Sequence, residues 1–241
     1  MRPHLLCLFL AAASSALAGG RDLIAYDVIT SAGKTAPQPA PGKPLAYLLL
    51  LGGYLQIGNT TGGEAPPAKD VVIRETEAAL RSQGYNPAIG QIRPDFLIVV
   101  HWGYMGSGKV DVDGVAVDLS DHQMVALVAG SSMSQYDILN PKRTNLLAEA
   151  HELRYFLIVS AFDFTAVEHH RKVLLWQARI STPVTGTNLA AMIPDLAKTG
   201  ASIFGKPTPD PKTTWIPEVP TGKVEVGTPV QVDSLAPAKR P

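Results

Sequence analysis

Long apolar runs dominate the hydrophobic and polar pattern of the chain. Residues 96–102 and 155–162 are almost continuously apolar or β-branched and are bounded by proline, glycine or charged residues. Runs of this length and composition predict buried strands. Residues 172–182 alternate, with Val173 and Leu175 in one phase and Leu174 and Trp176 in the other. This segment predicts a strand that pairs with residues 155–162 as a hairpin.

Glycine interrupts two further strand segments. Residues 45–57 are almost wholly apolar apart from Gly52 and Gly53. We expect one long strand there, kinked or bulged at the glycines, with its first half buried on both faces. Residues 110–119 change the phase of their alternation across Asp113 and Gly114, which predicts a hairpin turn or a bulge.

Helical spacing is clearest between residues 70 and 84. Asp70 is expected to cap the start of this helix, and Gly84 to take the left-handed position after its end. Residues 145–151 and 189–203 predict two further helices, the second kinked or shortened by Pro194. Residues 120–130 fit either a short helix or a strand, and residues 166–172 predict a polar turn. The apolar positions that define the first helix are Val72, Thr76, Ala79 and Leu80.

These elements predict an α+β fold in two layers, with a mainly antiparallel or mixed sheet and helices packed on one face. Proline and glycine number 20 and 21 of the 241 residues, and the prolines gather before residue 45 and after residue 204. We therefore expect a single domain over residues 45–204. A Pro-rich extended arm over residues 19–44 would precede it, and a Pro-rich tail over residues 205–241 would follow.

Residues 1–18 have the pattern of a secretory signal peptide. Arg2 precedes an apolar run that is too short to span a bilayer, and Ala16 and Ala18 supply the small side chains of a cleavage site. We expect cleavage after Ala18, export to the periplasm or cell envelope, and no transmembrane segment in the mature chain. Cys7 would leave with the leader, so the mature chain would have neither a disulfide nor a thiol nucleophile.

The charge balance argues against nucleic-acid binding. The chain has 21 Lys and Arg residues against 21 Asp and Glu residues, while 46% of its residues are hydrophobic, enough to bury a core. A polyanion is attracted by an excess of basic side chains, which this composition lacks. We expect no nucleic-acid partner.

Residues 103–109 match a phosphate-binding loop as far as Lys109. The next residue, Val110, has no hydroxyl for magnesium, and the alternation that follows predicts a strand instead of a helix whose N-terminus faces the phosphates. We therefore predict no nucleotide site and interpret the glycines as part of a loop after the strand.

Candidate metal ligands also lack the required spacing. Asp111, Asp113 and Asp118 have neither the glycine nor the terminal glutamate of a calcium loop. His169 and His170 are adjacent, so their side chains diverge on either a strand or a helix. We expect no metal and no cofactor.

No motif for nucleophilic catalysis is present. The chain has no Gly-x-Ser-x-Gly elbow, no Ser-x-x-Lys and no His-Glu-x-x-His. We therefore name no catalytic residue. An exported hydrolase with an unsignalled histidine–carboxylate or serine site remains the alternative function. Its residues would come from Ser131, Ser132, Ser160, His101, His122 and His151.

A family resemblance rests on residues 79–85, on Pro94 and Asp95 before the strand at 96–101, and on residues 172–178. This pattern, within residues 70–204, resembles a bacterial family of exported envelope proteins, often lipoproteins, known only as a domain of unknown function. The resemblance implies a strand-rich sheet with helices on one face and supplies no catalytic residues. Cys7 is badly placed for lipidation, so the chain departs from the usual lipoprotein form.

The leading hypothesis is an exported bacterial envelope protein that acts as a non-catalytic structural or interaction module. Its partners would be other envelope proteins. Tyr104, Met105 and the Pro-rich arms are expected to contribute to recognition, because exposed aromatic side chains and preordered segments lose little entropy on binding.

Overall fold

A computed structural model describes residues 23–32, 36–57, 64–106, 109–112, 115–118, 140–150, 152–184 and 186–217. The predicted leader lies outside the described residues, as do His122, Ser131, Ser132 and His151. The elements are β1 (Leu23–Ala32), β2 (Leu45–Ile57), α1 (Lys69–Ser82), β3 (Tyr85–Pro87), β4 (Phe96–Met105), β5 (Lys109–Val112), β6 (Val115–Asp118), α3 (Pro141–Ala150), β7 (Arg154–Asp163), α4 (Phe164–Glu168), β8 (Leu174–Pro183), α5 (Leu189–Ala201) and β9 (Lys212–Pro217).

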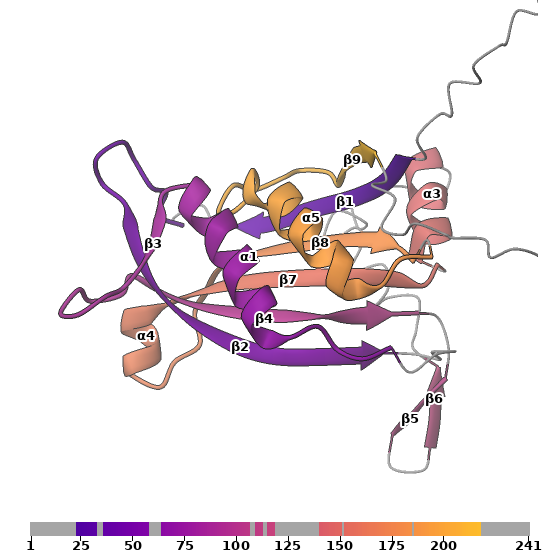
Figure 1. The fold of residues 1–241 in the computed structure, drawn as a ribbon, viewed down its shortest axis with the longest axis horizontal. Helices are drawn as coiled ribbons and strands as arrows, with labels where there is room; N and C mark the ends of the chain where they lie inside the picture. The colour runs from indigo at the N-terminus through magenta and orange to yellow at the C-terminus, as the bar shows by residue number, and fades with distance from the viewer. Residues whose placement is uncertain are drawn as a thin grey trace, which may run out of the picture. The chain divides into compact units, whose positions relative to one another are not determined.

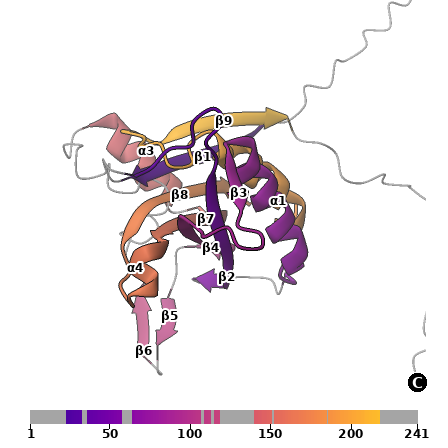
Figure 2. The same cartoon turned by 90° about the vertical axis from the view of Figure 1, so that its left-hand side faces the viewer.

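Seven strands form one mixed, curled sheet in the order β3-β2-β4-β7-β8-β1-β9 (Figure 1 and Figure 2). β2 runs parallel to β3 and β4, whereas β4, β7, β8 and β1 pair antiparallel in turn. β5 and β6 form a separate antiparallel hairpin. The predicted α+β class and both predicted hairpins are confirmed.

The core lies between the sheet and the helices α1 and α5, which pack together. Phe96, Ile98 and Val100 of β4 are fully buried, as alternation requires when one face of a strand meets a helix layer. Trp176 of β8 stacks on Phe204, just after α5, with ring centroids 5.5 Å apart. This contact fixes the end of α5 against the sheet.

β2 has the predicted length and bulge but not the predicted burial. Its register with β4 shifts between Leu51 and Gly53, as the glycines indicated. Tyr47 is buried, yet Leu48 and Leu50 are 49% and 53% exposed. The prediction of burial on both faces is wrong, because α1 and α5 cover only one face of the sheet. The apolar run alone did not indicate which face would be covered.

The helices differ from the predictions mainly at their ends. α1 begins after Ala68, which makes no side-chain capping bond, and Asp70 lies in the first turn instead of at the cap. Gly84 follows with a φ of 86°, as predicted. The predicted polar turn at 166–172 begins inside α4, which Asp163 caps by accepting the N–H of Ala166. Within the described ranges, no helix is long and apolar enough to cross a membrane.

Parts of the predicted arm and tail belong to the sheet. β1 pairs with β8, and β9 lies on the other side of β1. Residues 23–216 form one compact unit. The interpretation of residues 19–44 as an arm is therefore wrong for β1, and that of residues 205–241 as a tail is wrong for β9. Both strands carry polar side chains that weaken the apolar signal of a buried strand.

A buried ion pair joins β1 to β7. The side chains of Arg154 and Asp27 are 1% and 5% exposed, and Nη2 of Arg154 donates to the Asp27 carboxylate. Nε of Arg154 donates to the hydroxyl of Ser181 on β8 at 3.1 Å. The hydroxyl of Thr213 on β9 donates to the other Asp27 oxygen at 2.6 Å. The pair therefore links four strands.

We predict that Asp27→Asn lowers the free energy of unfolding by about 3–5 kcal/mol, because it leaves the buried Arg154 guanidinium without its counter-charge. Thr213→Val is the matched control. It removes one hydrogen bond to the same carboxylate and should cost about 1 kcal/mol. Urea unfolding followed by circular dichroism measures both. Equal, small losses for the two variants would contradict the assignment.

Candidate functional site

The sheet face opposite α1 and α5 carries exposed apolar side chains. Leu48 and Leu50 of β2 lie beside Leu97 and Val99 of β4 in register, and Leu97 lies beside Phe162 of β7. The β4 and β7 residues are half-buried. We call this surface, made of Leu48, Leu50, Leu97, Val99 and Phe162, the open face. A contiguous apolar surface of this kind is typical of an interaction site.

The open face becomes polar toward β8. Ser160 of β7 lies opposite Gln177, and Ile158 lies opposite Arg179. The hydroxyl of Ser160 accepts from Nε2 of Gln177 at 2.8 Å. Polar side chains therefore follow the apolar ones on this side of the sheet, although Ser160 itself is buried.

His101 lies on the same face, two residues beyond Val99. Its ring packs directly on Gly52, where an added Cβ would lie 2.3 Å from Nε2. Any side chain at position 52 would overlap the imidazole ring, so this position requires glycine. Burial lowers the pKa of His101 below its ordinary value of 6.5, because desolvation disfavours the charged ring. His101 is therefore neutral at pH 7 and adds an uncharged surface to the open face.

The described members of the predicted catalytic set do not form a catalytic pair. His101 lies opposite Ile158 in the register, and Ser160 lies opposite Val99. Ser160 is hydrogen-bonded to Gln177, and among the described residues no hydrogen bond joins it to His101. A serine nucleophile requires a base within hydrogen-bond reach, so these two residues do not meet the geometry of a hydrolase site.

The end of β4 corrects two expectations. Tyr104 and Met105 are 3% and 7% exposed, so the expectation that they contribute to surface recognition is wrong. Both residues belong to β4, which continues further than the sequence indicated. Gly103 lies inside this strand, and a Cβ there would lie 1.7 Å from the Leu55 carbonyl oxygen. This glycine permits close strand approach and is not part of a loop.

His169 and His170 lie at the exposed end of α4. Nδ1 of His169 is 2.7 Å from the Thr165 carbonyl oxygen, and His170 has a φ of 56°. Within the part of the chain that the structure describes, no three His, Cys, Asp or Glu side chains are grouped so that they could hold a metal ion.

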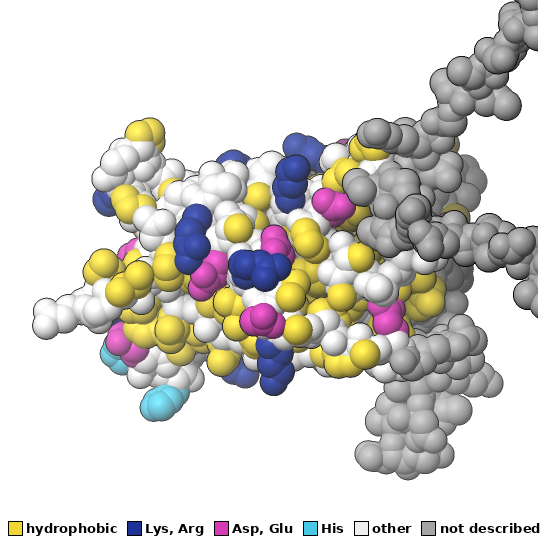
Figure 3. All heavy atoms as spheres, viewed as in Figure 1, with side chains coloured by type: hydrophobic (Ala, Val, Ile, Leu, Met, Phe, Trp, Pro, Cys, Tyr) yellow, Lys and Arg dark blue, Asp and Glu magenta, His cyan; other side chains and the backbone are white. Residues whose placement is uncertain are grey.

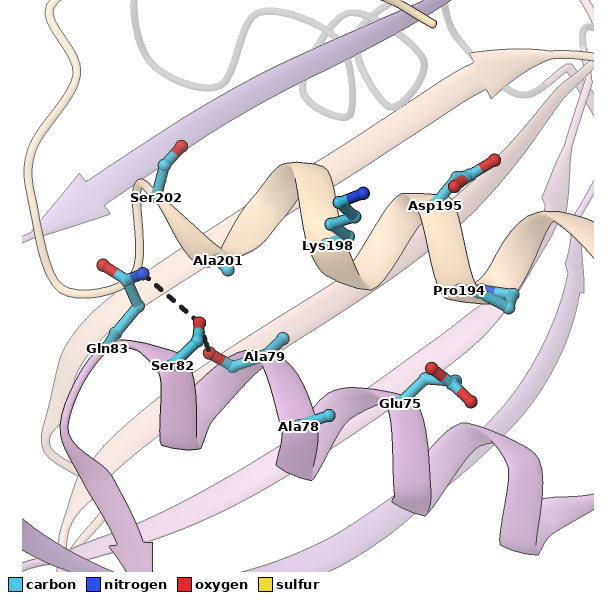
Figure 4. A pocket seen from close by; sticks show the side chains of 10 residues that line it. All are labelled: Glu75, Ala78, Ala79, Ser82, Gln83, Pro194, Asp195, Lys198, Ala201 and Ser202. Carbon is cyan, nitrogen blue, oxygen red and sulfur yellow. Dashed lines mark hydrogen bonds between the residues drawn. The ribbon is translucent and has the colours of Figure 1, made fainter. Parts of the chain in front are cut away.

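A groove of about 560 Å³ runs between α1 and α5 (Figure 4). Its charged lining residues are Glu75 of α1 and Asp195 and Lys198 of α5. Its lining serines, Ser82 and Ser202, donate to carbonyl groups one helical turn earlier. The described lining residues include neither a histidine nor a cysteine, and their polar groups are carboxylates, hydroxyls, an amide and an ammonium.

The surface over α1 and α5 carries mixed charge. Figure 3 shows basic and acidic side chains interspersed over this side. On α1, Arg81 pairs with Glu77 at 2.6 Å and Arg74 with Glu75 at 2.7 Å. Such mixing produces no basic stripe on this side of the molecule.

Comparisons with known proteins give fold-level similarity only. No family model and no curated protein matches the sequence. A PDZ domain protein from Parabacteroides distasonis has a TM-score of 0.42 at 11% identity; the match covers 80% of this chain but only 39% of that one. The PelC dodecamer from Paraburkholderia phytofirmans has a TM-score of 0.35 at 13% identity, covering 73% of this chain and 95% of that chain.

A DUF4136 family protein from Bacteroides thetaiotaomicron is also similar, with a TM-score of 0.34 at 15% identity, covering 73% of this chain and 92% of that chain. It is a bacterial protein from a family designated as a domain of unknown function, the same broad kind as the resemblance in the sequence. Similarities at this level carry no argument about activity, ligand or partner.

We predict that the free energy of unfolding falls as the pH drops below about 6.5, and that His101→Gln reduces this fall. The pKa of His101 is lowered in the folded state, so on acidification the unfolded chain binds a proton that the folded chain resists. Stability is therefore lost between the unfolded and folded pKa values. Urea unfolding from about pH 7.5 to 5 measures the slope. An unchanged slope in His101→Gln would contradict the assignment.

Proposed function

We propose that this chain is an exported bacterial envelope protein that acts as a non-catalytic interaction module and binds protein partners through the open face. The observation that carries this proposal is the exposure of Leu48 and Leu50 in the middle of a regular strand. Large aliphatic side chains side by side on a rigid sheet form a preorganised docking surface, because no loop has to be ordered on binding.

The magnitude of this effect is useful for a binding site. Full burial of a leucine side chain contributes roughly 1.5–3 kcal/mol. Leu48 and Leu50 are each about half exposed, so a partner that covers both would gain about 2 kcal/mol. This corresponds to roughly thirtyfold in affinity from two side chains.

Export is supported by the leader pattern of residues 1–18. The compact unit over residues 23–216 begins shortly after the expected cleavage site. Removal of the leader would therefore leave every strand of the sheet in place, including β1.

We predict that the cell processes the chain after Ala18. Intact-mass spectrometry of protein from the periplasmic or envelope fraction of a bacterial host should give a chain that begins at Gly19. An Ala16→Lys, Ala18→Lys variant should keep its leader, because the peptidase pocket accepts small side chains. Recovery of the unsubstituted chain in the cytoplasm with residues 1–18 intact would contradict export.

We predict that a photo-crosslinking side chain at Leu50 forms a discrete protein adduct in the envelope, whereas the same group at Ala190 on α5 does not. Both positions are exposed, but only Leu50 lies on the open face. Adding Leu48→Lys should weaken capture at Leu50, because the partner would have to bury a charge. Equal adducts from both positions, or capture unaffected by Leu48→Lys, would contradict docking at the open face.

A further inference from the structure

Among the strands that the structure describes, none pairs with most of the outer border of β2. β3 pairs only with Leu45, Ala46 and Tyr47 of β2. At this border the N–H of Leu45 donates to Gly84, and the carbonyl of Tyr47 accepts from Ala88. Both residues therefore direct their backbone polar groups away from β4.

The same alternation exposes the backbone further along β2. The backbone N–H and C=O groups of alternate residues point to the same side of a strand. Since those of Leu45 and Tyr47 point away from β4, those of Leu49 and Leu51 also point away from β4. No described residue donates to them or accepts from them. Within the described part of the chain they form an unpaired edge, and such an edge is a template for another strand.

The two borders of the sheet differ in how they are protected. β2 contains no charged residue and no proline over its 13 residues. β9, at the other border, has six residues, starts with Lys212, ends with Pro217 and follows Pro211. Charged residues, prolines and short length are the features that keep natural edge strands from pairing. Between the end of β3 and the bulge at Leu51 and Gly53, β2 lacks all three.

We infer that two copies of this chain associate edge to edge through antiparallel pairing of β2, which gives a two-fold symmetric dimer with one continuous sheet. The inference rests on the proposed function. It names a second copy of this chain as one protein partner, bound at the β2 edge beside the open face. A two-fold axis brings each side chain close to its own copy, so a charge on β2 would repel itself. β2 carries none. The pairing uses both β2 edges and leaves the protected β9 edges outside, so assembly stops at two copies.

The open backbone groups also define the register. Pairing that uses Leu49 and Leu51 places Leu49 opposite Leu51 of the second copy, with the two-fold axis at Leu50. It is confined to residues 48–52, because β3 occupies the border beside Leu45–Tyr47 and the register of β2 shifts between Leu51 and Gly53. Leu50 then faces its own copy as a non-hydrogen-bonded pair, with Cα atoms about 4.5 Å apart. Leu48 lies opposite Gly52 of the second copy. The two exposed leucines of each copy thus cover one another.

Disulfide crosslinking tests this register. In a chain that carries Cys7→Ser, Leu50→Cys places the only cysteines at the axis, at a separation that a disulfide spans. Leu48→Cys is the matched control, because Leu48 is equally exposed on the same face of the same strand. In the proposed dimer, position 48 of one copy would lie about 13 Å along the strand from position 48 of the other. With oxidised glutathione, we expect a disulfide-linked dimer to form about tenfold faster for Leu50→Cys. Equal rates would overturn the register.

A backbone variant tests the pairing itself. Leu49→Pro removes the outward N–H, whereas Leu49→Ala removes the same side chain but keeps the N–H. Light scattering over about a hundredfold range of concentration should give a dimer for the unsubstituted chain and for Leu49→Ala, and a monomer for Leu49→Pro. Circular dichroism checks that both variants fold. If Leu49→Pro does not fold, the crosslinking rates of Leu50→Cys and Leu48→Cys still test whether two β2 strands pair.

The failure of this inference and that of the proposed function are distinguishable. If the unsubstituted chain is a monomer at every concentration while photo-crosslinking at Leu50 still captures a different envelope protein, the dimer is wrong and the proposed function stands. If the Leu50 crosslinker captures neither a second copy nor another protein, both are wrong.

Discussion

The buried ion pair between Arg154 and Asp27 determines which strands belong to the sheet. A guanidinium removed from water requires a counter-charge and further hydrogen-bond acceptors, and these come from β1 and β8. Asp27 in turn accepts from Thr213 of β9. The pair therefore fixes two strands that are poor in continuous apolar sequence, and it places the last strand of the sheet at β9. At the opposite border, β3 covers only the first residues of β2.

The position of β2 at that border explains the candidate site. α1 and α5 cover one side of the sheet, so the other side of β2 retains exposed leucines, and β3 is too short to cover its edge. The same strand thus combines unpaired backbone groups with uncharged side chains. Gly52 adds to this arrangement, because it leaves room for the His101 ring against β2, and the neutral ring extends the uncharged surface.

Local sequence patterns predicted the positions of helices and strands better than they predicted which side chains are buried. The runs at residues 96–102 and 155–162 lie in β4 and β7, and the glycines of residues 45–57 mark the bulge. The strand β1 was missed because Asp27 and Thr30 are buried polar residues, whose pairing depends on strands far along the chain. Exposure of Leu48 and burial of Tyr104 likewise depend on which face the helices cover. His101 could be singled out from the sequence, but its contact with Gly52 follows only from the register of β2 and β4.

The geometry of His101 favours the docking interpretation over the alternative of a hydrolase. A general base must keep a proton acceptor close to the nucleophile that it activates, yet Ser160, the described serine of the predicted set, accepts a hydrogen bond from Gln177. Burial lowers the pKa of His101, and no acidic side chain among the described residues contributes to this shift. A neutral imidazole in such a position behaves as a flat, weakly polar side chain. Protonation would place a charge beside the leucines of the open face and oppose docking, so the lowered pKa of His101 keeps this surface uncharged for a partner at neutral pH.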